Sequence, residues 1–299
     1  MPTSNIRDLS ATWEEDKSIL VRHYYESINT NNLLLFSIIR DHLDEFKQVY
    51  PFVEFILCRI ETIFELVQHN RLWDAEIILR SVIESFVKLS YISFAQEDEK
   101  NIRLNEFWND LEEINSLKIS EQAKLNLKYA QDDEIQRVAY SPLIIPEDIE
   151  NKLREKWPRK KRQAIESKWS FTNIIKEISS QFKGTPLEVC ILATHNYRIC
   201  SHLTHGDETG LGIITERNHR TQEEQNKALR GHFIRLVNDC LCYVVMTSLS
   251  SIRFINLHSE QKEFLSLMKK DAQINEIEER YQSKVFEDTC YDKYRSRTT

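Results

Sequence analysis

The sequence predicts an all-α protein whose core is a bundle of long helices. Glycine is scarce, with none before Gly184, and the six prolines are scattered singly. A protein of strands and tight turns would need far more of these residues. Apolar residues instead recur at helical spacing over four long segments, which cover residues 32–50, 52–94, 186–205 and 222–258.

The order of these segments predicts how the chain is divided. Residues 1–31 are expected to be an N-terminal extension, and residues 32–258 are expected to form the helical core. Pro51 suits the first turn of a new helix, and residues 69–71 interrupt the apolar pattern. The second apolar segment is therefore expected to form two antiparallel helices.

Two other regions differ from the core in composition. Between about residues 96 and 168 the chain is polar with short amphipathic pieces, which predicts a helical insertion packed on the core, or a lid over it. Residues 259–299 are charged, and we expect them to form a solvent-facing helix and a frayed tail.

Charge and cysteine usage limit the class of protein. A net charge of −7 argues against a wholly basic surface, so any nucleic acid would have to meet a local basic patch. The six cysteines form no C-x-x-C pair, which is typical of a reducing compartment. The N-terminal sequence lacks the pattern of a secretory signal, and the apolar run 240–249 is too short to span a bilayer. We therefore expect a cytoplasmic protein with no membrane partner.

A pair of charged residues interrupts the most apolar helix. Residues 73–91 are apolar nearly all the way round a helix, which predicts that this helix is buried. Arg80 and Glu84 lie one turn apart within it, and buried charges need partners. Two interpretations remain open: a structural ion pair within the helix, or a pair of groups that orient catalytic side chains on another helix.

A second polar group lies near residue 200. His195, Arg198, His202 and His205 follow one another at spacings of three, four and three residues. At about 100° per residue their side chains share one face of a helix. Gly206 suits the position after the helix end, and Asp207 with the two next glycines is expected to form an irregular loop. A surface cluster without function, or histidines favoured by the helix dipole, would also explain the pattern.

These residues carry a resemblance to known families. The motif L-R-S-x-x-E followed by Y-R-x-x-S-x-x-x-H resembles an uncharacterised bacterial helical family of unknown function. It is also similar to the HEPN superfamily of helical ribonucleases, whose signature is an Arg followed a few residues later by a His. Arg198 and His205 enclose six residues, the longest spacing that the signature permits, and Ile199 stands where the superfamily often has a polar residue. The motif residues here are Leu79, Arg80, Ser81, Glu84, Tyr197, Arg198, Ser201 and His205.

The resemblance implies a HEPN-like core and an activity. The activity is metal-independent cleavage of RNA without a cofactor, of the toxin or antiphage-defence type, by a homodimer with a neutralising or triggering partner. His205 would handle the proton, and Arg198 would stabilise charge on the phosphorus centre. The groups that would support them are His202, Ser201, Tyr197, Arg80, Glu84, His195 and Asp207.

A short basic run is the candidate contact for RNA. Arg159, Lys160, Lys161 and Arg162 follow Trp157 and precede Trp169, so that phosphate contacts and base stacking could be combined. A solvated helix start is the simpler interpretation of the same run.

Two other functions remain open. His202 and His205, with His195, Asp207 or Glu84, could hold a metal ion, although no complete ligand motif such as H-E-x-x-H is present. Alternatively, the chain is a non-catalytic helical module that binds a nucleotide or a protein, and its polar residues form a structural network. Exposure of Arg198 and His205 separates these hypotheses, because a sealed network cannot reach RNA.

Overall fold

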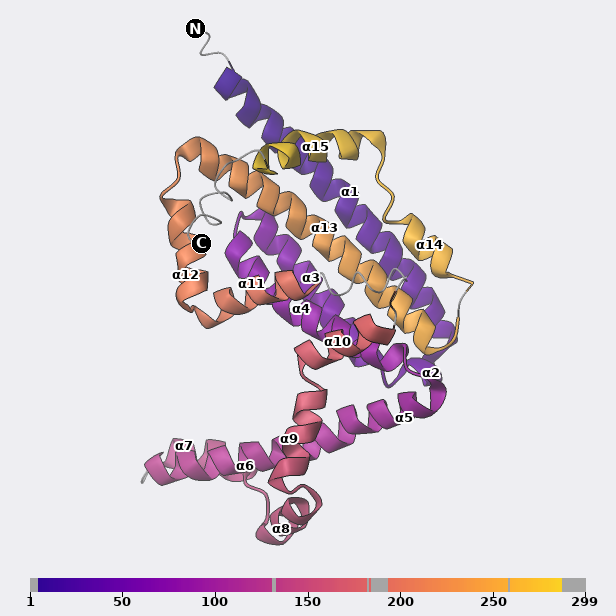
Figure 1. The fold of residues 1–299 in the computed structure, drawn as a ribbon, viewed down its shortest axis with the longest axis vertical. Coiled ribbons are helices and arrows are strands. Elements are labelled where there is room, and N and C mark those ends of the chain that lie inside the picture. Colours follow the sequence, from indigo (N-terminus) through magenta and orange to yellow (C-terminus); the bar gives the residue numbers. More distant parts are fainter. Residues whose placement is uncertain (1–4, 131–132, 182, 184–192, 258, 287–299) are drawn as a thin grey trace. The chain divides into compact units, whose positions relative to one another are not determined.

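The structure is a computed structural model that describes residues 5–130, 133–181, 183, 193–257 and 259–286. Within these ranges every regular element is a helix, which confirms the all-α class. The helices group into two compact units (Figure 1). Unit 1 comprises Met1–Ser93 and Val189–Thr299, and unit 2 comprises Phe94–Glu188.

Unit 1 is the helical bundle. Its long helices α1, α3, α4 and α13 pack against one another, and α11 packs on α4 (Figure 1). In chain order its helices are α1 (Asn5–Asp41), α2 (Leu43–Phe46), α3 (Tyr50–Gln68), α4 (Leu72–Ser93), α11 (Ala193–His205), α12 (Glu208–Asn218), α13 (Gln222–Phe254), α14 (Gln261–Ser266) and α15 (Ala272–Phe286).

Helix α1 is longer than the sequence pattern predicted. The first core helix was expected near residue 32, but α1 already begins at Asn5 and buries Trp13, Leu20 and Tyr24. These apolar residues lie among many charged ones, which lower the mean hydropathy of the segment. The apolar residues nevertheless form one buried stripe along the helix. The described part of the segment 1–31 is therefore not an extension outside the core, and the predicted helix 32–50 is divided between the end of α1, α2 and the start of α3.

The turn between α3 and α4 lies where the sequence predicted it. Pro51 occupies the first turn of α3, and Asn70 adopts a left-handed backbone with φ of 57° before α4 begins. Asparagine tolerates this conformation better than most residues. The turn allows α3 and α4 to pack side by side as a hairpin.

Helix α13 begins with a capping box and runs for 33 residues through the bundle. Thr221 and Glu224 each bond the other's backbone N–H at its start. By length and composition alone α13 could cross a membrane, but 67% of its most apolar window is buried in the bundle. The core helix of a globular bundle meets the same criterion, so the apolar run is explained by packing.

Helix α15 corrects the prediction for the C-terminal region. Ile274, Ile277 and Tyr281 are buried, so this helix packs against α1 and α13 instead of facing solvent on all sides. Its charged residues are anchored too, since Glu278 accepts a hydrogen bond from Tyr24 and Arg280 pairs with Asp16 at 2.8 Å. Residues 287–299, which include the predicted frayed tail 291–299, lie outside the described residues.

Unit 2 is helical and extends beyond the predicted insertion of 96–168. It also includes α10, because the buried Arg103 of α5 reaches Glu177 of α10 at 2.7 Å. In chain order its elements are α5 (Glu97–Asn105), the π-helical η1 (Glu106–Asp110), α6 (Leu111–Ala130), α7 (Glu134–Tyr140), the 3₁₀ turn η2 (Ser141–Leu143), α8 (Glu147–Lys156), α9 (Arg159–Lys168) and α10 (Phe171–Gln181).

Candidate functional site

The polar face of α11 is open to solvent. His195, Arg198 and His205 are exposed, and Ser201 and His202 are half-buried. The opposite face is anchored, because Cys200 and Leu203 are buried in unit 1. The periodicity therefore predicted the face correctly, while the part of the expected helix from 186 to 192 lies outside the described residues.

The end of α11 is fixed by Gly206 and Asp207. Gly206 has a φ of 56°, the left-handed conformation that ends a helix, as the sequence predicted. The following residues do not form an irregular loop, because Asp207 caps a new helix, α12, by accepting a bond from the Gly210 N–H at 3.0 Å. A methyl group added at Gly210 would collide with the backbone carbonyl of His202, so this glycine permits α12 to approach α11.

His202 is held by the same aspartate. Its Nδ1 lies 2.7 Å from an Asp207 carboxylate oxygen, and this contact together with the Gly210 N–H lowers the pKa of Asp207. Asp207 is therefore a charged partner that fixes the orientation of the His202 ring. Among the described residues no group of three or more His, Cys, Asp or Glu is placed to hold a metal ion, so the metal-site hypothesis has no assembled ligand set there.

Arg80 reaches α11 from the neighbouring helix. Its Nη2 donates to the Tyr197 hydroxyl at 3.3 Å, and its guanidinium carbon lies 5.3 Å from the centre of the Tyr197 ring. Glu84 pairs instead with Lys88 at 3.0 Å, so the intrahelical ion pair of Arg80 and Glu84 is not formed. Among the motif residues, Arg80 and Tyr197 therefore link the two helices, whereas Glu84 pairs within its own helix.

A buried carboxylate that the sequence analysis missed lies one turn before Arg80. Glu76 is 2% exposed, and it accepts hydrogen bonds from His232 at 2.6 Å and from the Cys200 thiol at 3.1 Å. It also forms an ion pair with Arg235. Burial raises the pKa of Cys200 to about 12, so the sulfur keeps the proton that it donates. Glu76 thereby connects α4, α11 and α13.

His232 is a neutral member of this network. Arg217 approaches its Nδ1 at 2.9 Å, and because a guanidinium only donates, the ring proton must lie on Nε2, which faces Glu76. Burial and the Arg217 charge lower the pKa of His232 to about 3. The guanidinium of Arg217 also stacks over Trp73, which lies against His232. The network therefore extends into α12.

Asp239 adds a second carboxylate beside Arg235. The two side chains pair at 2.7 Å, and Asn196 of α11 donates to Asp239 at 3.3 Å. Burial raises the pKa of Asp239, against the opposing effect of Arg235.

The sequence does contain a signal for Glu76. Glu76, Arg80 and Glu84 follow one another at four-residue intervals, and this spacing could have placed Glu76 beside Arg80 and Glu84 on one face of the helix from sequence alone.

The basic run forms the first turn of α9 in unit 2, but its tryptophans are unavailable for base stacking. Trp157 is 2% exposed and donates to Glu113 at 2.6 Å, while Trp169 donates to Glu106 at 3.0 Å. The prediction of stacking is therefore wrong. Of the basic side chains, Arg159, Lys160 and Lys161 are exposed, and Lys161 also lies over the Trp157 ring. Arg162 is half-buried and faces Glu121.

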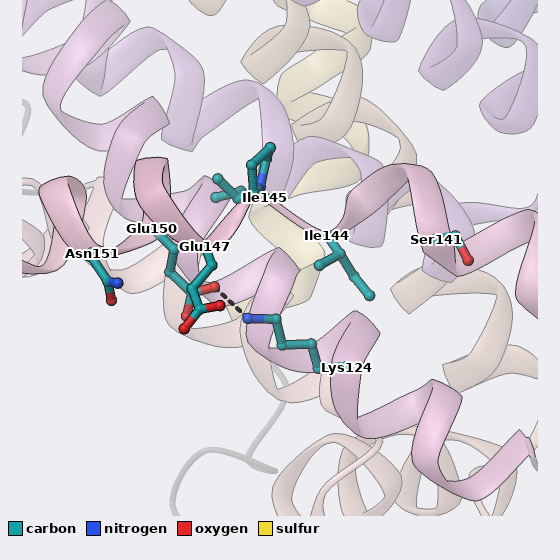
Figure 2. A pocket seen from close by; sticks show the side chains of 8 residues that line it. Lys124, Ser141, Ile144, Ile145, Glu147, Glu150 and Asn151 are labelled. Carbon is teal, nitrogen blue, oxygen red and sulfur yellow. Dashed lines mark hydrogen bonds and ion pairs between the residues drawn. The ribbon is translucent and has the colours of Figure 1, made fainter.

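Unit 2 also carries an open hollow where η2 and α8 meet α6. Figure 2 shows Lys124 and Glu150 among the side chains that line it, joined as an ion pair, with Ile144 and Ile145 also lining it. Arg154 pairs with the same glutamate at 2.7 Å, and both cations lower the pKa of Glu150. The charge of Glu150 in this hollow is therefore compensated by Lys124 and Arg154 of the same unit, which is typical of a structural surface.

Comparison with known proteins gives a family without a known activity. No curated protein and no solved structure matches the chain. A model for a family of unknown function, DUF5677, matches residues 56–226. The match runs from within α3 to the start of α13, which includes α4, unit 2, α11 and α12. Since more than half of the chain is covered, this protein belongs to the DUF5677 family.

Proposed function

We propose that this chain is a metal-independent endoribonuclease of HEPN-like type, with Arg198 and His205 as its reactive groups. The observation that supports it most directly is that both side chains are exposed on one face of α11, whose other face is anchored in the bundle. Exposed reactive groups on a rigid helix can meet a polymer as large as RNA.

The chemistry requires only groups that this face carries. The ribose 2′-oxygen attacks the adjacent phosphorus, and the bond from phosphorus to the 5′-oxygen breaks. A 2′,3′-cyclic phosphate remains, and the leaving 5′-oxygen takes a proton from water and departs as a hydroxyl. His205 would accept the proton of the 2′-hydroxyl, since imidazole exchanges protons near neutral pH. Arg198 would stabilise the charge on the phosphoryl oxygens with its planar donors. His202, fixed by Asp207, and the neighbouring Ser201 and His195 are supporting polar groups.

The setting of this activity is part of the proposal. Arg159 and Lys160 would contact RNA phosphates, because both are exposed and make no ion pair with another described residue. The enzyme would act in the cytoplasm as a homodimer of the toxin or antiphage-defence type, under the control of a neutralising or triggering partner.

The product ends test this function. We expect purified protein to cleave single-stranded RNA in EDTA and to leave 2′,3′-cyclic phosphate ends. The matched control is the same oligonucleotide with 2′-deoxyribose throughout, which lacks the attacking group and should remain intact. Cleavage of the deoxy oligonucleotide, or products with 3′-hydroxyl ends, would contradict this mechanism.

A non-catalytic module is the second candidate. It is favoured by the network around the buried Glu76, in which His232, Arg235 and Cys200 join three helices, as a structural network does. Under this hypothesis α11 presents a binding face for a nucleotide or a protein. Protein that binds a nucleotide or RNA and leaves RNA intact under every condition tested would favour the module.

A further inference from the structure

The charges along α4 are not balanced in pairs. Glu76, Arg80, Glu84 and Lys88 follow one another at four-residue spacing and share one stripe of a helix that is otherwise mostly apolar. Glu76 is compensated by Arg235, and Glu84 by Lys88. Arg80 is the remaining charge on the stripe.

Arg80 lacks a counter-ion among the residues that the structure describes. No Asp or Glu oxygen lies within ion-pair distance of it there, and its Nε is buried without a hydrogen-bond partner. Among the described residues its one hydrogen bond is the donation to the neutral Tyr197 hydroxyl at 3.3 Å. A half-buried guanidinium that keeps a donor unsatisfied is costly, and an anion bound beside it would remove this cost.

The position of Arg80 places this charge beside the candidate reactive face. Tyr197 precedes Arg198 in α11, and Ser201 lies one turn further on. At about 100° per residue, Tyr197, Ser201 and His205 form a continuous strip from the α4 contact to the exposed face. A ligand that contacts Arg198 and His205 can therefore extend along this strip toward Arg80.

We propose that Arg80, with Tyr197 as its neighbouring wall, binds a phosphate oxyanion. A planar guanidinium suits the oxygens of a phosphate, and binding supplies the missing counter-charge. In RNA this group is the phosphodiester next to the one that is cleaved. The RNA assignment rests on the proposed ribonuclease function, whereas binding of the oxyanion does not.

Binding of inorganic phosphate to the full chain tests the inference. Titration at low ionic strength, followed by calorimetry or by ³¹P line broadening, gives the affinity without any cleavage step. Arg80→Gln removes the charge, and Arg71→Gln is the matched control, because Arg71 precedes the same helix and is exposed. We expect the wild type and Arg71→Gln to bind alike, and Arg80→Gln to bind roughly tenfold more weakly or worse.

Each outcome bears on one claim. Equal affinity of Arg80→Gln and wild type overturns the inference, and so does a wild type that binds no phosphate. If circular dichroism shows that Arg80→Gln does not fold, Arg80→Lys replaces it. Lysine keeps the charge but lacks the planar set of donors, so we expect weaker phosphate binding. A phosphate affinity of Arg80→Lys equal to that of the wild type then overturns the inference. A protein that binds phosphate through Arg80 but never cleaves RNA refutes the ribonuclease function alone. Conversely, RNA cleavage with phosphate affinity independent of Arg80 refutes the inference alone.

The same variants identify the source of the phosphate. A 2′-O-methyl oligoribonucleotide cannot be cleaved by attack of the 2′-oxygen, so its affinity reports binding only. If Arg80 contacts a phosphodiester, Arg80→Gln weakens oligonucleotide and phosphate binding together. Loss of phosphate binding alone would assign the site to a free anion and would contradict the RNA assignment.

Discussion

The Cys200 thiol donates a hydrogen bond to the buried Glu76 carboxylate at 3.1 Å. Cys200 lies two residues after Arg198, so the two side chains are separated by about 200° around α11. The bond therefore ties α11 to α4 on the side away from the candidate reactive face. The rigidity of that face depends on groups that do not themselves face solvent.

The first prediction concerns Glu76 and stability. Glu76→Gln removes the charge of a buried carboxylate that accepts hydrogen bonds from His232 and Cys200, and we expect a loss of about 1–3 kcal/mol in the free energy of unfolding. Glu84→Gln, on the same stripe of α4, removes a partly exposed pair with Lys88 and should cost about 1 kcal/mol or less. Urea unfolding of both variants gives the comparison. Equal losses of unfolding free energy in the two variants would show that the network around Glu76 stabilises the fold no more than the pair of Glu84 with Lys88.

The second prediction concerns pH. His232 titrates at about pH 3 in the folded state and at 6.5 in the unfolded chain, so only the unfolded chain takes up this proton between those values. Its contribution to stability is complete above pH 6.5 and falls as the pH drops, by about 1.4 kcal/mol per unit. Between pH 6.5 and 5 this amounts to about 2 kcal/mol.

The control for this prediction is His232→Gln. Glutamine offers a donor and an acceptor without titrating, and Asp239 is unchanged in both proteins. Urea unfolding between pH 6.5 and 5 should show a shallower fall in stability for the variant. The same slope in both proteins would contradict the neutral, buried state of His232.

The third prediction uses two glycines of α12. Gly210→Ala places a methyl group against the His202 carbonyl, so α12 must shift, at a cost of about 1–3 kcal/mol. Gly212→Ala meets nothing within 4 Å and should be neutral or stabilise by up to about 1 kcal/mol, because alanine favours helix. Thermal unfolding separates the two variants. A neutral Gly210→Ala would contradict the close approach of α11 and α12.

The fourth prediction concerns RNA binding by unit 2. Arg159→Gln with Lys160→Gln should lower RNA affinity and reduce the slope of log affinity against log salt by about 1.4, at about 0.7 per phosphate on a single strand. The stability of the protein should not change, because both side chains are exposed. Lys152→Gln with Lys156→Gln on α8 provides a control of equal charge. An unchanged salt slope in the first variant would exclude these contacts.

The sequence predicted the fold more completely than the site. Glycine scarcity and helical spacing determine the class, and Pro51 with Asn70 locates the α3–α4 turn, because these signals are local. The length of α1 and the burial of α15 were missed, since both depend on partners distant in the chain. Residues within one helix, such as Arg198 and His205, could be grouped by periodicity alone.

The remaining part of the site depends on tertiary contacts. Glu76 and His232 lie far apart in the sequence, and each alone resembles an ordinary helix residue. The tryptophans beside the basic run were misassigned for the same reason, because their indole N–H groups bond to glutamates of other helices. Periodicity shows which residues share a face, and it cannot show what covers that face.

Comparative RNA cleavage by three variants tests the central claim most directly. Initial rates in EDTA are measured for Arg198→Ala, His205→Ala and the control His219→Ala, an exposed histidine on the neighbouring turn whose ring contacts the Thr215 carbonyl. With folding verified by circular dichroism, we expect losses of roughly 10²-fold or more for the first two and none for the control. Cleavage by the wild type that survives both substitutions, or no cleavage by the wild type with or without added divalent metal, would contradict an Arg198 and His205 active site.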